Sequence, residues 1–163
     1  MNRRTNLILS IFVTLLMLSG GISVSAQGFP KKALASVTEE RARNIVGFLA
    51  DDLLQGRDAG MQGGYLAAEY IVSLFKEWGV EPFLESGYCQ PFTAVKNVNN
   101  WLTEADRDIA PLIADGCATR ELRNILAVIP GKEDGIVVVG AHYDHLGIDA
   151  TLQGDSCFNG ADD

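Results

Sequence analysis

The sequence predicts an α/β fold in which helices cover both faces of a sheet. Three observations lead to this expectation. Two segments, 36–54 and 65–78, place apolar residues at the spacing of an amphipathic helix. Two others, 88–95 and 122–129, are rich in strand-forming residues. The residues 136–139 are all β-branched, so this strand is apolar on both faces, as is typical of a central parallel strand buried between helices.

The first 26 residues have the pattern of a secretory signal peptide. Arg3 and Arg4 precede a largely apolar run, 7–18, that is too short to be a comfortable membrane span. Val24-Ser25-Ala26 supplies the small residues of a cleavage site. We therefore expect cleavage after Ala26, export to the periplasm or the medium, and no membrane span in the mature chain. An uncleaved N-terminal anchor is the alternative.

The charge balance bears on the class of partner. The chain carries 13 basic and 21 acidic residues, for a formal net charge of −8 at pH 7. The predicted signal peptide holds two arginines and no acidic residue, so the rest has 11 basic against 21 acidic residues, a net charge of −10. Because phosphate binding needs clustered Lys and Arg, this balance argues against a nucleic acid partner.

The three cysteines, Cys89, Cys117 and Cys157, lie in a chain that we expect to be exported. One disulfide is therefore permitted, and three pairings stay open. No two cysteines have the Cys-x-x-Cys spacing, so the sequence does not indicate a cysteine zinc site or a thiol redox site. A buried, unpaired thiol is the alternative for each.

The helical part of the chain follows a short predicted linker, 27–35. The helix 36–54 begins with Ser36-Val37-Thr38-Glu39, which has the form of a capping box. The second helix, 65–78, is expected to end at Gly79, because glycine commonly terminates helices.

The loop between the two helices, 55–64, is rich in glycine. We expect Gly56 and Gly60 to be turn residues with positive φ. Arg57 lies between them, and we expect it to anchor the loop rather than to bind a substrate.

Two strands are expected to precede the final one. Pro91 favours an edge position for the strand 88–95, because proline cannot donate to a neighbouring strand. The strand 122–129 is followed by a short connection that contains Asp134 and Gly135. This spacing predicts a hairpin between 122–129 and 136–139.

Polar residues follow the predicted central strand, where sites form in open α/β sheets. His142 and Asp144 are two positions apart, so on extended backbone they point to the same side. An imidazole that binds a metal needs an acceptor for its other N–H, and a nearby carboxylate supplies one. The loop that follows ends in two carboxylates, Asp162 and Asp163, and a carboxylate can bridge two zinc ions. A structural histidine at the end of a strand is the alternative.

The stretch 139–147, Val-Gly-Ala-His-Tyr-Asp-His-Leu-Gly, together with 159–163, Asn-Gly-Ala-Asp-Asp, resembles the metal-binding core of the two-zinc aminopeptidase family. That family includes bacterial secreted aminopeptidases, glutamate carboxypeptidases and glutaminyl cyclases. The resemblance implies a three-layer α/β/α sandwich around a twisted mixed sheet. It also implies that His142 binds one zinc, that Asp144 orients His142, and that Asp163 bridges both zincs. It leaves Asp162 and His145 as supporting groups.

By this resemblance the protein is expected to be an exported zinc-dependent exopeptidase of the aminopeptidase type, with peptides as substrates and two zinc ions as cofactors. Zinc would activate water and polarise the scissile carbonyl. The family's glutamate general base and later ligands come after the position of Asp163. We therefore expect 36–163 to be the N-terminal part of the peptidase domain, inactive and poorly folded by itself. The alternatives are a glutaminyl cyclase-like acyltransferase with one zinc and a non-catalytic binding domain of the same fold.

Overall fold

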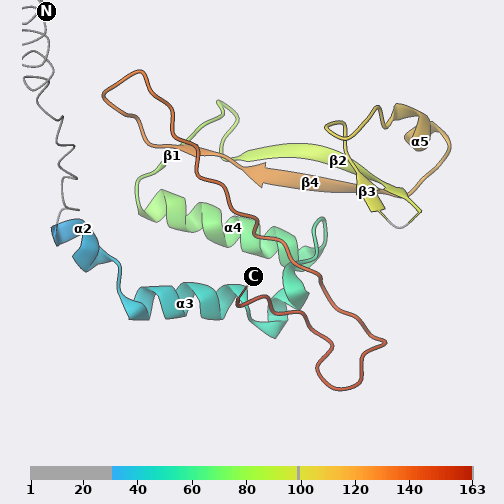
Figure 1. Cartoon of the computed structure of the whole chain (residues 1–163), viewed down its shortest axis with the longest axis horizontal. Coiled ribbons are helices and arrows are strands. Elements are labelled where there is room, and N and C mark those ends of the chain that lie inside the picture. The colour runs from blue at the N-terminus through green and yellow to red at the C-terminus, as the bar shows by residue number, and fades with distance from the viewer. Residues whose placement is uncertain (1–30, 99, 163) are drawn as a thin grey trace, which may run out of the picture. The chain divides into compact units, whose positions relative to one another are not determined.

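The computed structural model describes residues 31–98 and 100–162 (Figure 1). The chain divides between Thr38 and Glu39 into two compact units. The second unit holds all the described strands and every residue of the predicted site.

The described part of the first unit is the helix α2 (Lys31–Ser36), which occupies part of the predicted linker 27–35. The Ser36 hydroxyl donates to the carbonyl oxygen of Ala33 at 2.7 Å. Ser36 therefore closes α2, and the predicted capping box does not begin a helix at this residue. The predicted signal peptide, 1–26, lies outside the described residues.

Helix α3 (Glu39–Leu49) is shorter at both ends than the predicted helix 36–54. The chain then makes the 3-10 turn η1 (Asp52–Arg57). Three consecutive residues of η1 have positive φ, namely Gln55 at 50°, Gly56 at 64° and Arg57 at 51°. Left-handed residues cannot continue a right-handed helix, so the chain reverses here. The positive φ predicted for Gly56 and for Gly60 (76°) is confirmed.

Helix α4 (Gln62–Glu77) is the predicted second helix, and it begins three residues earlier than expected. Its first turn lies directly against η1, since a Cβ at Gly63 would be 1.6 Å from the carbonyl oxygen of Leu54. Further along the helix, Ala67 is completely buried. Gly79, with a φ of 69°, follows the end of the helix as predicted.

The main sheet has three antiparallel strands in the order β3 (Asn100–Leu102), β2 (Cys89–Asn97) and β4 (Thr119–Ile125). The strands β2 and β4 confirm the two strands predicted for this part of the chain. β2 pairs with β4 along most of its length, but β3 pairs only with residues 95–97. Pro91 therefore has one strand neighbour among the described residues, which is the edge environment that its missing N–H predicts.

The helices α3 and α4 lie on the same side of this sheet, with α4 between α3 and the strands (Figure 1). The rings of Phe48 in α3 and Tyr70 in α4 are 4.1 Å apart. On the sheet side of α4, the Tyr65 hydroxyl donates to the carbonyl oxygen of Glu121 at 2.5 Å. A third helix, α5 (Ala110–Ala114), packs on β2. The fold is a mixture of helices and antiparallel sheets, and the described residues do not form the predicted mixed sheet or three-layer sandwich.

The predicted central strand is wrong. Residues 136–139 form no strand, and their exposed fractions lie between 86% and 92%. The predicted hairpin is wrong as well, because its first strand has another partner: β5 (Ala127–Val128) pairs with β1 (Glu81–Pro82). A β-branched run forms a strand only where a neighbour receives its backbone hydrogen bonds. The described residues give this run no such neighbour.

Candidate functional site

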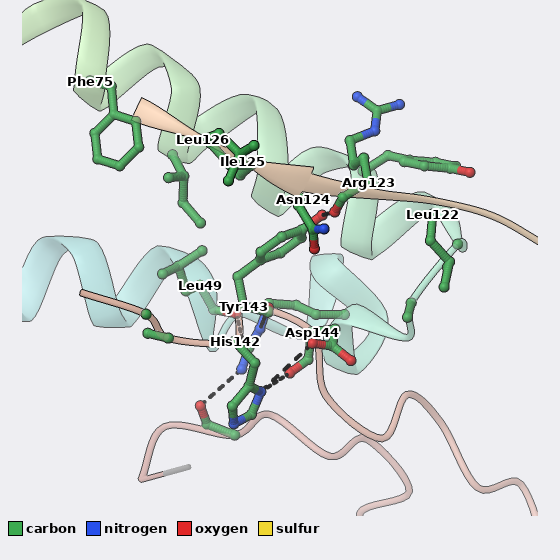
Figure 2. Close-up of a pocket in the computed structure, with 18 of the residues that line it drawn as sticks. Leu49, Phe75, Leu122, Arg123, Asn124, Ile125, Leu126, His142, Tyr143 and Asp144 are labelled. Atoms are coloured by element: carbon green, nitrogen blue, oxygen red, sulfur yellow. Dashed lines mark hydrogen bonds and ion pairs between the residues drawn. The ribbon is translucent and has the colours of Figure 1, made fainter. Parts of the chain in front are cut away.

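The segment 138–144 borders a groove of about 890 Å³ whose other walls come from α3, α4 and β4. Figure 2 shows the apolar side chains of Phe75 and Leu126 on one side of the view, and His142 and Asp144 on the other. A mainly apolar groove with a few convergent polar groups is the usual form of a small-molecule site. Two of the predicted site residues, His142 and Asp144, therefore line this groove.

The structure brings His142 and Asp144 together, as their spacing predicts. Nδ1 of His142 lies 2.8 Å from the main-chain carbonyl oxygen of Asp144 and 3.7 Å from its carboxylate Oδ1. The side chains are 56% and 48% exposed. The close contact is thus to the backbone of Asp144, whereas the sequence predicts a contact to the carboxylate.

This contact fixes the protonation pattern of the His142 ring. A carbonyl oxygen can only accept a hydrogen bond, so Nδ1 of His142 carries the hydrogen and donates it. The neutral ring then has its lone pair on Nε2. A metal ligand needs this tautomer, with one nitrogen held by an acceptor and the other presenting a lone pair.

His145, the residue after Asp144, contacts the turn η1 and the loop that leads to Gly160. Its backbone N–H donates to the carbonyl oxygen of Arg57 at 3.1 Å, and its ring meets the Phe158 ring edge-on at 6.5 Å. A Cβ at Gly160 would lie 2.8 Å from the His145 ring, so the loop passes directly beside it. These contacts place His145 as a support for the loop.

Tyr143 points away from His142 and joins the segment to β4. Its hydroxyl donates to the carbonyl oxygen of Arg123 at 2.7 Å. Burial raises the pKa of Tyr143 from its usual 10.0 to about 12, and the nearby Arg123 guanidinium opposes that shift. The phenol is therefore neutral at physiological pH and acts as a hydrogen-bond donor.

The Tyr143 shift predicts a loss of stability in alkali. In the unfolded chain the phenol ionises near pH 10, whereas in the folded chain it ionises near pH 12. The contribution is fully present below pH 10 and is lost as the pH rises through 12. Two pKa units correspond to about 2.7 kcal/mol, which solvent screening of this half-buried phenol reduces to about 1–2 kcal/mol. Urea unfolding of the wild type and of Tyr143→Phe, from pH 8 to 12, should show the wild type falling by this extra amount. Tyr70→Phe is the control, and equal slopes for wild type and Tyr143→Phe would contradict the shift.

Arg57 connects several segments around the site, and its side chain makes the loop-anchoring contacts that the sequence predicts. It is only 4% exposed. Its guanidinium donates to the carbonyl oxygens of Tyr143 (2.9 Å), Asn159 (2.7 Å) and Gly160 (3.0 Å), and also to that of Leu49. Burial lowers the pKa of Arg57 and the Asp144 carboxylate raises it, and a guanidinium stays charged at neutral pH in either case.

Asn159 is a second anchor, which the sequence analysis did not identify. Its side-chain amide donates to the carbonyl oxygen of Ala50 at 2.7 Å and to Oδ1 of Asp52 at 2.6 Å. The signal available in the sequence was an asparagine directly before a glycine, a pair that favours a turn. The loop between the two site segments is closed at its base, where the Phe158 N–H donates to the carbonyl oxygen of Gly147 at 3.0 Å.

The remaining predicted acidic groups come at the end of this loop. Asp162 is exposed, and Asp163 lies outside the described residues. Within the described part of the chain, no group of three or more His, Cys, Asp and Glu side chains is arranged to hold a metal ion. The thiols of Cys89, Cys117 and Cys157 are unpaired, and burial raises the pKa of Cys157.

The donor chemistry of these residues fits zinc. His142 has the tautomer of a zinc-binding imidazole, and Asp144 supplies the acceptor behind it. The loop that Arg57 holds beside this segment leads into two carboxylates, and nitrogen with carboxylate oxygen is a common ligand set for catalytic zinc.

No family model, curated protein or solved structure matches this chain. In residues 31–98 and 100–162, no helix is long and apolar enough to cross a membrane.

Proposed function

We propose that this chain belongs to an exported zinc-dependent exopeptidase of the aminopeptidase type, which removes N-terminal residues from peptides. One observation carries the proposal: the hydrogen bond from His142 to Asp144 prepares the imidazole for a metal, at the rim of the groove. The motif resemblance of 139–147 and 159–163 supplies the reaction class. The acidic balance of the chain is compatible with a peptide partner and unfavourable for nucleic acid.

In this proposal His142 binds zinc through Nε2, and the Asp163 carboxylate is a shared ligand of two zincs. Asp144 keeps the hydrogen on Nδ1 and so holds the ring in the ligating tautomer. Asp162 and His145 support the loop. When bound, zinc activates water and polarises the carbonyl of the scissile bond. The resemblance implies a glutamate general base at a position beyond Asp163, so metal binding is the appropriate readout for residues 1–163.

The test is a zinc titration of the full chain against a chromophoric chelator, followed by imidazole ¹H–¹⁵N spectra. His142 and His145 are the only histidines, so each ring gives an assignable set of signals. We expect saturable zinc binding, a large shift of His142 Nε2 with its Nδ1–H retained, and a smaller change at His145. Magnesium, which prefers oxygen ligands and retains water, is the control and should leave both rings unchanged.

Two results would contradict the proposal. If neither ring responds while the protein is folded, the chain is a binding domain without a metal. If one zinc binds per chain and does not depend on Asp163, the cyclase-like alternative with a single zinc replaces the aminopeptidase.

A further inference from the structure

The Arg57 guanidinium joins the two segments that carry the predicted ligands. It donates to Tyr143 in the segment of His142 and Asp144, and to Asn159 and Gly160 in the segment that leads to Asp163. We propose that Arg57 is a positioning residue that sets the spacing between these two segments and thereby the geometry of the metal site. The effect of Arg57 on the metal site rests on the proposed function, whereas its effect on the spacing of the two segments does not.

The turn η1 holds the segment of His142 and Asp144 both through its backbone and through the Arg57 side chain. The carbonyl oxygens of Gly56 and Arg57 accept the N–H groups of Gly147 (3.0 Å) and His145 (3.1 Å), respectively. Nε of Arg57 reaches the carbonyl oxygen of Tyr143 at 2.9 Å. The backbone at Arg57 is left-handed, with a φ of 51°. This conformation is part of the chain reversal in η1, whose carbonyl oxygens accept the two hydrogen bonds from His145 and Gly147.

The second segment approaches the guanidinium so closely that it has no room for a side chain at Gly160. A Cβ there would lie 2.7 Å from Nη2 of Arg57 and 2.8 Å from the ring of His145. The Asn159 side chain fixes the same segment to Ala50, which follows α3, and to Asp52, the first residue of η1. Asp162 comes two residues after Gly160, so its position depends on where Arg57 holds the loop.

Only an arginine can make this set of contacts. Its planar fork presents five N–H donors in fixed directions, and here it serves carbonyls from three parts of the chain. A lysine has one ammonium on a flexible stem, so it can keep the charge but cannot span the same acceptors. Without the fork, the Gly147–Phe158 contact still closes the base of the loop, but the alignment of that loop with His142 is lost.

The test compares Arg57→Lys with Arg120→Lys in the full chain. Arg120 is the control because its guanidinium also makes short hydrogen bonds, to Asp58 (2.7 Å) and Ala59 (2.9 Å), and donates directly to no carbonyl of Tyr143, Asn159 or Gly160. In Arg57→Lys we expect the amides of His145 and Gly147 to exchange at least about tenfold faster, while the β2–β4 amides keep their protection. The Arg120→Lys variant should leave the His145 and Gly147 amides within about threefold of the wild type.

Zinc affinity and the imidazole spectra are measured on the same samples. We expect Arg57→Lys to weaken zinc binding about 10- to 100-fold and to move the His142 signals before any zinc is added. Exchange at His145 and Gly147 that stays within threefold of the wild type would overturn the inference, whatever happens to zinc. A wild type that binds no zinc overturns the proposed function alone, because the exchange experiment needs no metal.

If the Arg57→Lys variant loses protection from hydrogen exchange throughout the sheet, the Gly160→Ala variant provides the test of the inference. This change forces a Cβ against Nη2 of Arg57 and the His145 ring from the loop side, while every donor of Arg57 is kept. Faster exchange confined to His145 and Gly147 supports the inference. Unchanged exchange there in a folded Gly160→Ala protein overturns it.

Discussion

Gly63→Ala is expected to abolish stable folding of the second unit. An alanine Cβ at this position would lie 1.6 Å from the carbonyl oxygen of Leu54 and 2.5 Å from its carbonyl carbon. Both are backbone atoms of η1, so no side-chain rotation relieves the clash, and η1 must separate from α4. Overpacking of this kind costs about 3–5 kcal/mol, which is comparable with the whole stability of a small domain.

A helical glycine without neighbours provides the control. Gly47 lies in α3, is exposed, and has nothing within 4 Å of an added Cβ. Alanine is the better helix former at both positions, so Gly47→Ala should stabilise the protein by about 0.5–1 kcal/mol. Urea unfolding followed by circular dichroism measures both variants. A Gly63→Ala protein that unfolds within about 1 kcal/mol of the wild type would show that η1 and α4 are not packed as described.

Local signals in the sequence predicted the helices and the turn between them. The spacing of apolar residues predicted α4, and Gly79 marked its end. The glycines of the interhelical loop correctly indicated positive φ at Gly56 and Gly60. These features depend on neighbours within one or two turns of the chain, which is the range that propensity and capping describe.

The central strand was not predictable in the same way. Residues 136–139 have the strongest strand composition in the chain, yet they are exposed and unpaired with any described strand. Whether a β-branched run forms a strand depends on a partner elsewhere in the sequence. Here 127–128, at the end of the predicted partner, pairs with 81–82. Residue composition indicates that a segment can form a strand, but it does not identify the strand with which that segment pairs.

The site was predicted only in part, because some of its contacts are local and others join residues far apart in the sequence. His142 and Asp144 are two residues apart, so spacing indicated that they lie close together, but the close contact is to the Asp144 carbonyl oxygen and not to its carboxylate. The bonds from Arg57 to Tyr143 and Gly160 span 86 and 103 residues. A single sequence marks Arg57 as a residue of a glycine-rich turn, and only the folded chain shows which carbonyls it reaches. The exposed position of His142 at the groove rim likewise depends on those distant contacts.

The proposed ligands should give the largest effects on metal binding. We expect His142→Ala to weaken zinc binding at least about 100-fold, because it removes the proposed nitrogen ligand, whose Nδ1 donates to the Asp144 carbonyl oxygen. In a protein that also contains the ligands expected after Asp163, Asp163→Ala should remove all tight zinc binding, because a bridging carboxylate serves both ions. The expectation for Asp163 comes from the sequence, since that residue lies outside the described part of the chain.

For each proposed ligand, a neighbouring residue of the same type serves as the control. His145→Ala removes the other imidazole, whose backbone and ring support the loop. Asp162→Ala removes one negative charge from the residue beside Asp163. Both controls should weaken zinc binding by no more than about tenfold, the lower end of what supporting groups contribute. Equal losses for His142→Ala and His145→Ala would mean that the two rings matter only through the loop. Unchanged affinity in Asp163→Ala, with a loss in His142→Ala, would leave a single-zinc site and favour the cyclase-like reaction over the aminopeptidase.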